Sequence, residues 1–203
     1  ASALMQGLAD GYFVLPYTIQ NYLADQITVP RFSTELPEFA EAEKAVQARI
    51  DHLMGIKGKK SVDSIHKELG HIMWEYVGMG RTEEGLKTAL KLLKDIRKEF
   101  ETNLFIPGST EGVNIELEKA LRLNDFITMG ELIAYDALNR NESCGGHFRE
   151  EYQTEEGEAK RDDENYFYVS CWEYQGSDDV APVLYKEPLV YEAIKVQTRN
   201  YKS

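Results

Sequence analysis

Residues 61–78, SVDSIHKELGHIMWEYVG, carry a complete helical repeat. Their large apolar side chains recur every three or four residues, which places them on one face of an α-helix. These side chains are Val62, Ile65, Leu69, Ile72, Met73, Tyr76 and Val77. Ser61 is a suitable N-cap and Gly78 a suitable stop, so we predict one amphipathic helix between them.

Three more segments repeat this pattern, one before and two after. The first covers residues 39–53, the second follows a predicted N-cap at Thr82, and the third runs from Asn114 to about Arg140. The second half of the last helix, residues 126–138, is apolar nearly all round, so we expect several neighbours to bury it. The predicted fold class is mainly α, an up-and-down three-helix bundle with a preceding helix.

Both flanks of the bundle differ from it in pattern. Residues 1–26 predict a helix that Pro16 kinks or breaks, and residues 27–37 predict an extended connection. Past Asn141 the helical period is lost, while residues 166–175 and 180–186 predict two strands around a turn. We therefore expect a C-terminal extended tail with a small β-hairpin, and three regions with bounds 1–36, 37–140 and 141–203.

Charge and composition exclude several classes of partner. The chain of 203 residues has 35 acidic and 23 basic residues and a net charge of −12. This argues against nucleic acid, which needs a basic surface, and against docking on anionic lipid. No apolar run approaches the ~20 residues of a membrane span, so we expect no direct membrane insertion. Two cysteines, Cys144 and Cys171, suit a reducing compartment.

The motif HKELGH at residues 66–71 resembles a zinc helix only superficially. Its histidines are five apart instead of four, and Lys67 stands where a zinc protease needs glutamate. At about 100° per residue the two rings diverge by about 140°. Glu68-x-x-His71 is one copy of a di-iron motif that requires two. We therefore predict no metal site, and no catalytic residue among these groups.

The stretch RNESCGGHFR, residues 140–149, follows the last helix directly. It places Arg140, Glu142, His147 and Arg149 around a diglycine bend. One reading is a solvated loop closed by local salt bridges. The position at the exit of a buried helix favours the other reading, which is a buried polar network.

This stretch resembles the Arg-x-Glu-Ser-Arg-Gly-Ala-His-x-Arg signature of the flavoprotein subunit of succinate dehydrogenase and fumarate reductase. Cys144 and Gly146 replace the usual Arg and Ala. Further motifs agree in order along nearly the whole chain: ASALMQG at 1–7, GMGR at 78–81 with Gly85 and Leu86, RDDEN at 161–165, and QTRNY at 197–201. The sequence of residues 3–27 most resembles that of the bacterial enzymes that pair with a single cytochrome b subunit. Compared with the family pattern, this chain has extra acidic residues between positions 154 and 160, and these predict an exposed loop.

The resemblance implies that the dinucleotide-binding fold, the capping domain and the catalytic residues lie upstream of Ala1. We therefore expect the chain to be a C-terminal fragment that is inactive alone, although its parent is an FAD-dependent oxidoreductase. Its implied partners are the N-terminal flavin and capping domains, an iron–sulfur subunit and, indirectly, the cytochrome b subunit. The implied location is cytoplasmic, on the inner face of the membrane through these subunits.

The implied FAD contacts of this chain fall on Ala3 and Leu4, through backbone amides at a helix start. A structural or interface role, without catalysis, is expected for Arg140, Glu142, His147, Arg149, Asp162 and Asp163. Two alternatives stay open. One is the same domain of a related flavoprotein, of the aspartate oxidase or adenylylsulfate reductase type, and the other is a free-standing helical protein-interaction module. Without its flavin domain, the face of Leu4, Leu8 and Tyr12 should be exposed and should drive self-association.

Overall fold

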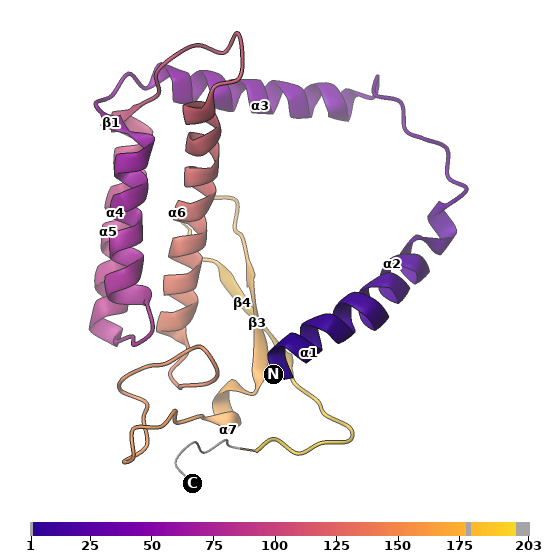
Figure 1. Cartoon of the computed structure of the whole chain (residues 1–203), viewed down its shortest axis with the longest axis vertical. Coiled ribbons are helices and arrows are strands. Elements are labelled where there is room, and N and C mark those ends of the chain that lie inside the picture. The colour runs from indigo at the N-terminus through magenta and orange to yellow at the C-terminus, as the bar shows by residue number, and fades with distance from the viewer. Residues whose placement is uncertain (1, 178–179, 198–203) are drawn as a thin grey trace. The chain divides into compact units, whose positions relative to one another are not determined.

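The computed structural model describes residues 2–177 and 180–197 (Figure 1). The described chain divides after Ala48 into two compact units. The predicted QTRNY ending lies largely outside the described residues, since Arg199 and Tyr201 are beyond them.

The first unit is helical at both ends. It contains α1 (Ser2–Ala9), the π-helical turn η1 (Asp10–Val14), α2 (Leu15–Leu23), the 3-10 turn η2 (Ala24–Gln26) and the start of α3 (Pro37–Gly55). Pro16 lies in the first turn of α2, where its missing N–H costs nothing, and the change of helix type falls just before it. Leu4, Leu8 and Tyr12 are exposed, as expected for this unit alone.

The second unit is built on three helices: α4 (Val62–Val77), α5 (Glu83–Asn103) and α6 (Ile115–Asn139). They lie side by side and pack pairwise, which confirms the predicted up-and-down bundle (Figure 1). The core holds the apolar faces that the repeats predicted, among them Ile65, Leu69, Leu86, Leu93, Phe100, Leu123 and Ile127. Leu53, near the end of α3, joins the same core.

The predicted N-caps are confirmed. Ser61 Oγ accepts from the Ser64 amide at 3.2 Å, and Thr82 Oγ1 accepts from the Gly85 amide at 3.0 Å. Asn114, predicted only as the start of its helix, also caps it, because its Oδ1 accepts from the Leu117 amide at 3.1 Å. Each cap satisfies one of the backbone donors that a helix start leaves without a partner.

A short parallel strand pairing, which the helical apolar repeats do not predict, joins two helix ends. Strand β1 (Lys60–Ser61) pairs with β2 (Leu104–Phe105), so the start of α4 is held beside the end of α5. Gly58 donates its amide to Leu104 O at 2.9 Å. A Cβ on Gly58 would lie 2.0 Å from the carbonyl carbon of Asn103, so only glycine fits this close approach.

Gly58→Ala is therefore expected to lower the free energy of unfolding by about 2 kcal/mol, because the two backbones must separate. Urea denaturation followed by helical circular dichroism measures this. Gly55→Ala is the matched control, since nothing lies within 4 Å of a Cβ there. Equal stability of the two variants would contradict the close approach.

The expectation that neighbours bury all of residues 126–138 is wrong. In α6 only the face toward α4 and α5 is buried, through Ile127, Ala134 and Ala137. Phe126, Met129, Leu132 and Ile133 remain 38–53% exposed. Phe126 stacks on His66 of α4, and Leu132 and Ile133 line a cleft beside β3, so the second unit covers this second face only in part. We call these four partly exposed residues the α6 apolar face.

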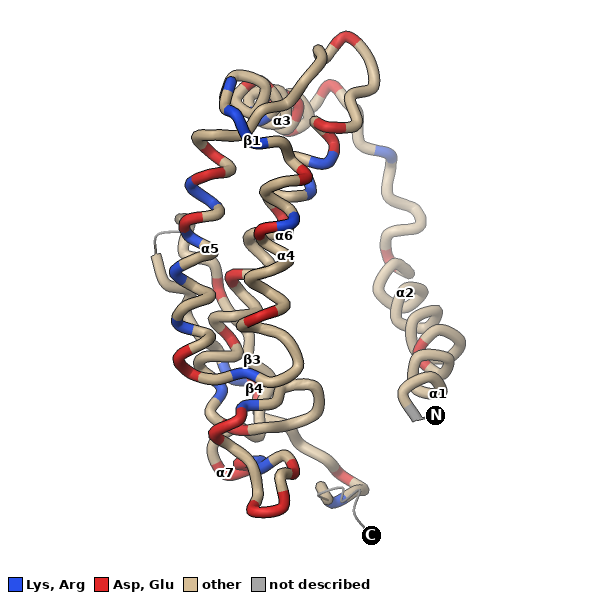
Figure 2. The backbone as a smooth tube through the Cα atoms, turned by 60° about the vertical axis from the view of Figure 1, so that its left-hand side comes forward, with Lys and Arg blue, Asp and Glu red and all other residues tan. Residues whose placement is uncertain are grey.

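The tail returns along the bundle as a hairpin. After α7 (Asp163–Tyr166), strand β3 (Tyr168–Glu173) pairs antiparallel with β4 (Val183–Pro188). The hairpin is confirmed, but the return strand starts after Pro182 and not at Val180, because proline has no N–H for a ladder. Acidic residues gather in the loop before α7, where Glu155 and Glu156 are exposed as expected (Figure 2). None of the described helices combines the length and apolar character that crossing a membrane requires.

Candidate functional site

The chain leaves α6 in a tight turn. We call residues 140–152 the return loop. Cys144 and His147 exchange backbone hydrogen bonds of 2.8 and 3.0 Å across the diglycine. Gly145 has a φ of +59°, a left-handed conformation that favours glycine. The turn sends the loop back toward the helix ends, so the charged side chains predicted from RNESCGGHFR can reach the bundle.

Arg149 is fully buried against the end of α6. Its Nη1 donates to Ala137 O at 3.0 Å and Leu138 O at 3.4 Å, and its Nε donates to Glu151 at 3.1 Å. These carbonyls belong to the last turn of a helix, where a cation is favoured by the helix dipole. Nη2 is also buried and has no hydrogen-bond partner among the described residues. Arg149 therefore caps α6 and fixes the return loop to it.

Arg81, in the turn between α4 and α5, caps α4 in the same way. Its Nε donates to Val77 O and Gly78 O, both at 3.2 Å. Its backbone joins the return loop, because Arg81 N donates to Phe148 O at 3.0 Å and Arg81 O accepts from Glu150 N at 2.9 Å. Burial lowers the pKa of Arg81. Arg81 was absent from the expected site, although the GMGR motif contains it.

His147 lies between these two caps and is half-buried. Its Nδ1 is 3.0 Å from Arg81 Nη1, and its Nε2 is 2.9 Å from Arg140 O. Because arginine only donates, Nδ1 must accept, and Nε2–H then donates to the carbonyl. The ring is thus assigned as neutral. Burial lowers the pKa of His147, and the nearby arginines lower it further.

Glu142 and Arg140 join the end of α6 to the tail. Glu142 is buried, and it accepts from Arg140 Nε and from the Asp162 amide, both at 2.9 Å. Arg140 Nη2 also donates to Tyr166 O at 2.6 Å, and its guanidinium lies over the ring of Tyr168. Each polar atom of the buried carboxylate is therefore engaged, which is what makes its burial tolerable.

Asp162 and Asp163 lie beside this network. The Asp162 carboxylate accepts from Asn165 N at 3.2 Å and caps α7, while Asp163 pairs with Arg161 at 2.9 Å. Ala3 and Leu4 are exposed in the first turn of α1. Within the described residues, no group of three His, Cys, Asp or Glu side chains could hold a metal ion.

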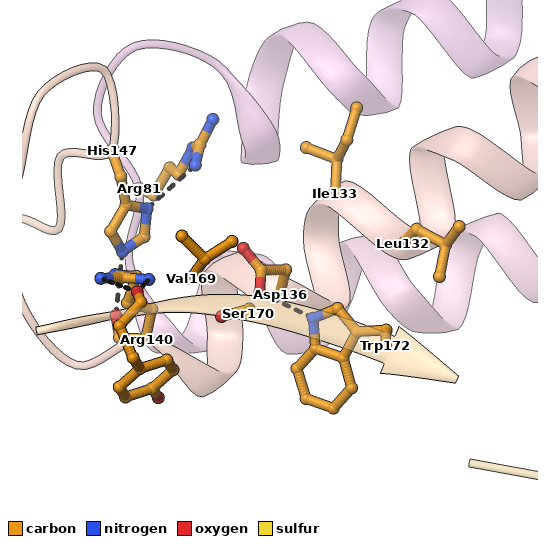
Figure 3. A pocket seen from close by; sticks show the side chains of 10 residues that line it. Arg81, Leu132, Ile133, Asp136, Arg140, His147, Val169, Ser170 and Trp172 are labelled. Carbon is orange, nitrogen blue, oxygen red and sulfur yellow. Dashed lines mark hydrogen bonds between the residues drawn. The ribbon is translucent and has the colours of Figure 1, made fainter. Parts of the chain in front are cut away.

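An open cleft of about 530 Å³ lies between the return loop, α6 and β3. Figure 3 shows Arg81, His147 and Arg140 in a row at one end, with Asp136 and Trp172 toward the other. Trp172 Nε1 donates to Asp136 Oδ1 at 2.7 Å, and the Trp172 ring meets Tyr135 edge-on at 5.0 Å. Neither Asp136 nor Trp172 was expected here. The signal that could have found them is the indole N–H, which requires an acceptor when a tryptophan packs.

The Asp136–Trp172 bond attaches the hairpin to α6. Trp172→Phe is expected to lower the free energy of unfolding by about 1 kcal/mol, because Asp136 loses a hydrogen bond while the apolar contact is mostly kept. Urea denaturation measures this. Trp74→Phe is the control, since Trp74 is 84% exposed. If both variants are as stable as the wild type, Trp172 does not hold the hairpin.

The comparison with family models decides the family. Residues 66–201 match the model described as fumarate reductase flavoprotein C-term. The chain belongs to this family. The matched span contains most of α4 and all of α5, α6, the return loop and the hairpin, so Arg81, Arg140, Glu142, His147 and Arg149 all lie in the flavoprotein C-terminal domain.

Curated relatives agree. A fumarate reductase flavoprotein subunit of Proteus vulgaris is 29% identical over 148 residues, which is 71% of this chain and 24% of that protein. An uncharacterized FAD-dependent oxidoreductase of Methanocaldococcus jannaschii is 31% identical over 112 residues, 55% of this chain and 20% of that protein. An L-aspartate oxidase of Nicotiana tabacum is 37% identical over 88 residues, 43% of this chain and 13% of that protein. The chain thus spans about a quarter or less of these relatives.

Solved structures share the fold. A quinol–fumarate reductase with menaquinol molecules matches 83% of this chain and 28% of its own, with a TM-score of 0.67 and 22% identity. The adenylylsulfate reductase of Archaeoglobus fulgidus matches 88% of this chain and 28% of its own, with a TM-score of 0.60 and 20% identity.

Proposed function

We propose that the chain is the C-terminal part of a longer FAD-dependent polypeptide that interconverts succinate and fumarate. The observation that carries this proposal is the family match over residues 66–201 in a chain spanning 24% of the Proteus fumarate reductase subunit. Residues 1–36 then belong to the flavin domain and its connection, 37–140 to the helical domain and 141–203 to the tail. The chain alone is inactive, because the groups that carry hydride and proton lie in the rest of the polypeptide.

This chain would touch FAD only at the start of α1. The backbone amides of Ala3 and Leu4 lie in the first helical turn, where amides have no acceptor within the helix. They fit an oxygen acceptor of the cofactor, favoured there by the helix dipole. FAD supplies the hydride chemistry when bound. The residues of this chain hold and orient one edge of its site.

The α6 apolar face would receive the FAD-bearing portion of the same polypeptide. Its four large side chains are partly exposed, and Val169 of β3 adds an apolar side chain that is 49% exposed. Contiguous apolar surface of this kind marks an interface, because a soluble protein gains by covering it. The polar network of Arg81, Arg140, Glu142, His147 and Arg149 holds the ends of α4 and α6 and the start of β3 in fixed positions. Its proposed role is therefore to position this surface.

Larger partners follow from the resemblance and from the name of the Proteus relative, which is called a subunit. We propose an iron–sulfur subunit that contacts the tail region, and through it a membrane cytochrome b subunit. The complex would sit on the inner face of the cytoplasmic membrane. The residues proposed to form these interfaces, or to fix the loop beside them, are Arg140, Glu142, His147, Arg149, Asp162 and Asp163.

A related flavoprotein is the second candidate. The aspartate oxidase relative has the higher identity, 37%, although over 88 residues only. The substrate of the parent depends on residues outside this chain, so a direct assay must choose between them.

The test uses the complete polypeptide and the 203-residue chain, purified in parallel. We expect bound flavin in the visible spectrum and succinate-dependent dye reduction for the complete polypeptide, and neither for the chain. Turnover of aspartate or sulfite instead of succinate would favour the related flavoproteins. Absence of flavin from the complete polypeptide would support a free-standing interaction module and defeat the proposal.

A further inference from the structure

We propose that His147 is an acid-sensitive latch, whose protonation releases the return loop from the turn between α4 and α5. The ring joins three segments: it accepts from Arg81 in that turn, donates to Arg140 at the end of α6, and belongs to the loop itself. The inference concerns contacts within this chain and does not depend on the activity of the parent.

The geometry admits only the neutral ring. Arg81 Nη1 is 3.0 Å from Nδ1 and can only donate to it. A proton on Nδ1 would set two N–H groups against each other and remove the acceptor. The other nitrogen is engaged by Arg140 O at 2.9 Å, so the ring cannot keep both contacts by flipping.

The charges around the ring also oppose protonation. Arg81, Arg140 and Arg149 all act on it as positive neighbours. The carboxylates of the packed elements are already engaged: Asp136 of α6 by Trp172, and Glu142 by Arg140 and the Asp162 amide. Glu151 accepts from Arg149 and from the Glu83 amide of α5. From β3, Tyr168 faces Arg140 through its carbonyl and ring.

The sign of the effect follows from linkage. Burial and the arginines hold the pKa of His147 below its usual value of 6.5. The unfolded or released loop then binds the proton more readily than the closed loop does. The contacts of His147 with Arg81 and with Arg140 O are fully present above pH 6.5. They weaken as the pH falls from there toward the lowered pKa of His147.

Only the return loop and its contacts with the turn between α4 and α5 would be released. Beside the ring, the backbone bonds Arg81 N to Phe148 O and Glu150 N to Arg81 O tie the loop to the turn. Leu86 and Leu93 of α5 are fully buried and take no part in these bonds. Protonation should therefore expose the amides of Arg81 and Glu150 while α5 keeps its protection.

Amide hydrogen exchange of the 203-residue chain tests this, read by mass spectrometry for peptides covering 79–83, 147–152 and 86–100. Protection factors are corrected for the intrinsic pH dependence of exchange. Between about pH 7.5 and about pH 5.5 we expect protection of the first two peptides to fall by up to about tenfold, the limit that the usual histidine pKa of 6.5 sets over this range, with the α5 peptide unchanged.

His147→Gln is the decisive variant, because an amide can accept and donate like the neutral ring but does not titrate. It should keep protection at both pH values, whereas His71→Gln, at an exposed position of α4, should behave like the wild type. A pH-independent wild type, or the same loss in His147→Gln, overturns the latch. If His147→Gln does not fold, ring nitrogen NMR of the wild type decides: protonation of His147 must coincide with the loss of protection, and a separate transition overturns the proposal.

Discussion

Replacing Arg149 with methionine is expected to lower the free energy of unfolding of the chain by about 3 kcal/mol, measured by urea denaturation. Methionine fills much of the same volume but cannot donate to Ala137 O and Leu138 O, which the arginine holds at 3.0 and 3.4 Å. These carbonyls would stay buried without a partner, and Glu151 would lose its cation. The last turn of α6 and the return loop should loosen together.

The control for this variant is Arg122→Met. Arg122 is an exposed residue of α6 whose ion pair with Glu118 lies on the helix surface. Such surface pairs contribute little, so the urea midpoint should stay where it is. If the Arg149 variant is also within about 1 kcal/mol of the wild type, the buried guanidinium does not hold the loop.

The second large effect concerns the α6 apolar face. Ile133→Asp is expected to weaken binding of this chain to the separately expressed N-terminal portion of the complete polypeptide by at least about 100-fold. A carboxylate at that position would be buried without a partner in the proposed interface. Ile133 is 42% exposed in the chain alone, so the variant should fold normally.

Calorimetry of the two fragments measures this affinity, with helical circular dichroism as the check on folding. Val113→Asp is the matched control, because it makes the same kind of change at a fully exposed position before α6. Equal affinities for both variants would place the interface elsewhere on the chain.

The helices and their caps could be predicted because their signals are local. The signals are the repeats of α4, α5 and α6 and the caps Ser61 and Thr82, and each depends on residues within one turn of each other. The same holds for the hairpin, whose strands lie close in sequence. Such local signals do not depend on contacts with distant parts of the polypeptide.

The missed features depend on distant partners. Arg81 and His147 are 66 residues apart and Trp172 and Asp136 are 36 apart, and no spacing rule connects them. The β1–β2 pairing is equally non-local. The face of residues 126–138 was misjudged for a related reason: apolar character predicts that a surface is covered, but it does not say whether the cover lies in this chain.

The charged stretch around the diglycine already pointed to Arg140, Glu142, His147 and Arg149, and the structure brings these four together with Arg81. Sequence reasoning alone left a solvated loop open as an alternative. The full burial of Arg149 and the near-complete burial of Glu142 favour a packed network over that loop.

The most direct measurement of the central claim is sedimentation of the 203-residue chain with FAD, with and without the separately expressed N-terminal portion, followed by flavin absorption. The account predicts that flavin sediments with the chain only when the N-terminal portion is present, in one complex containing both fragments. Flavin bound to the chain alone, or an N-terminal portion that holds flavin and leaves the chain behind, would contradict it.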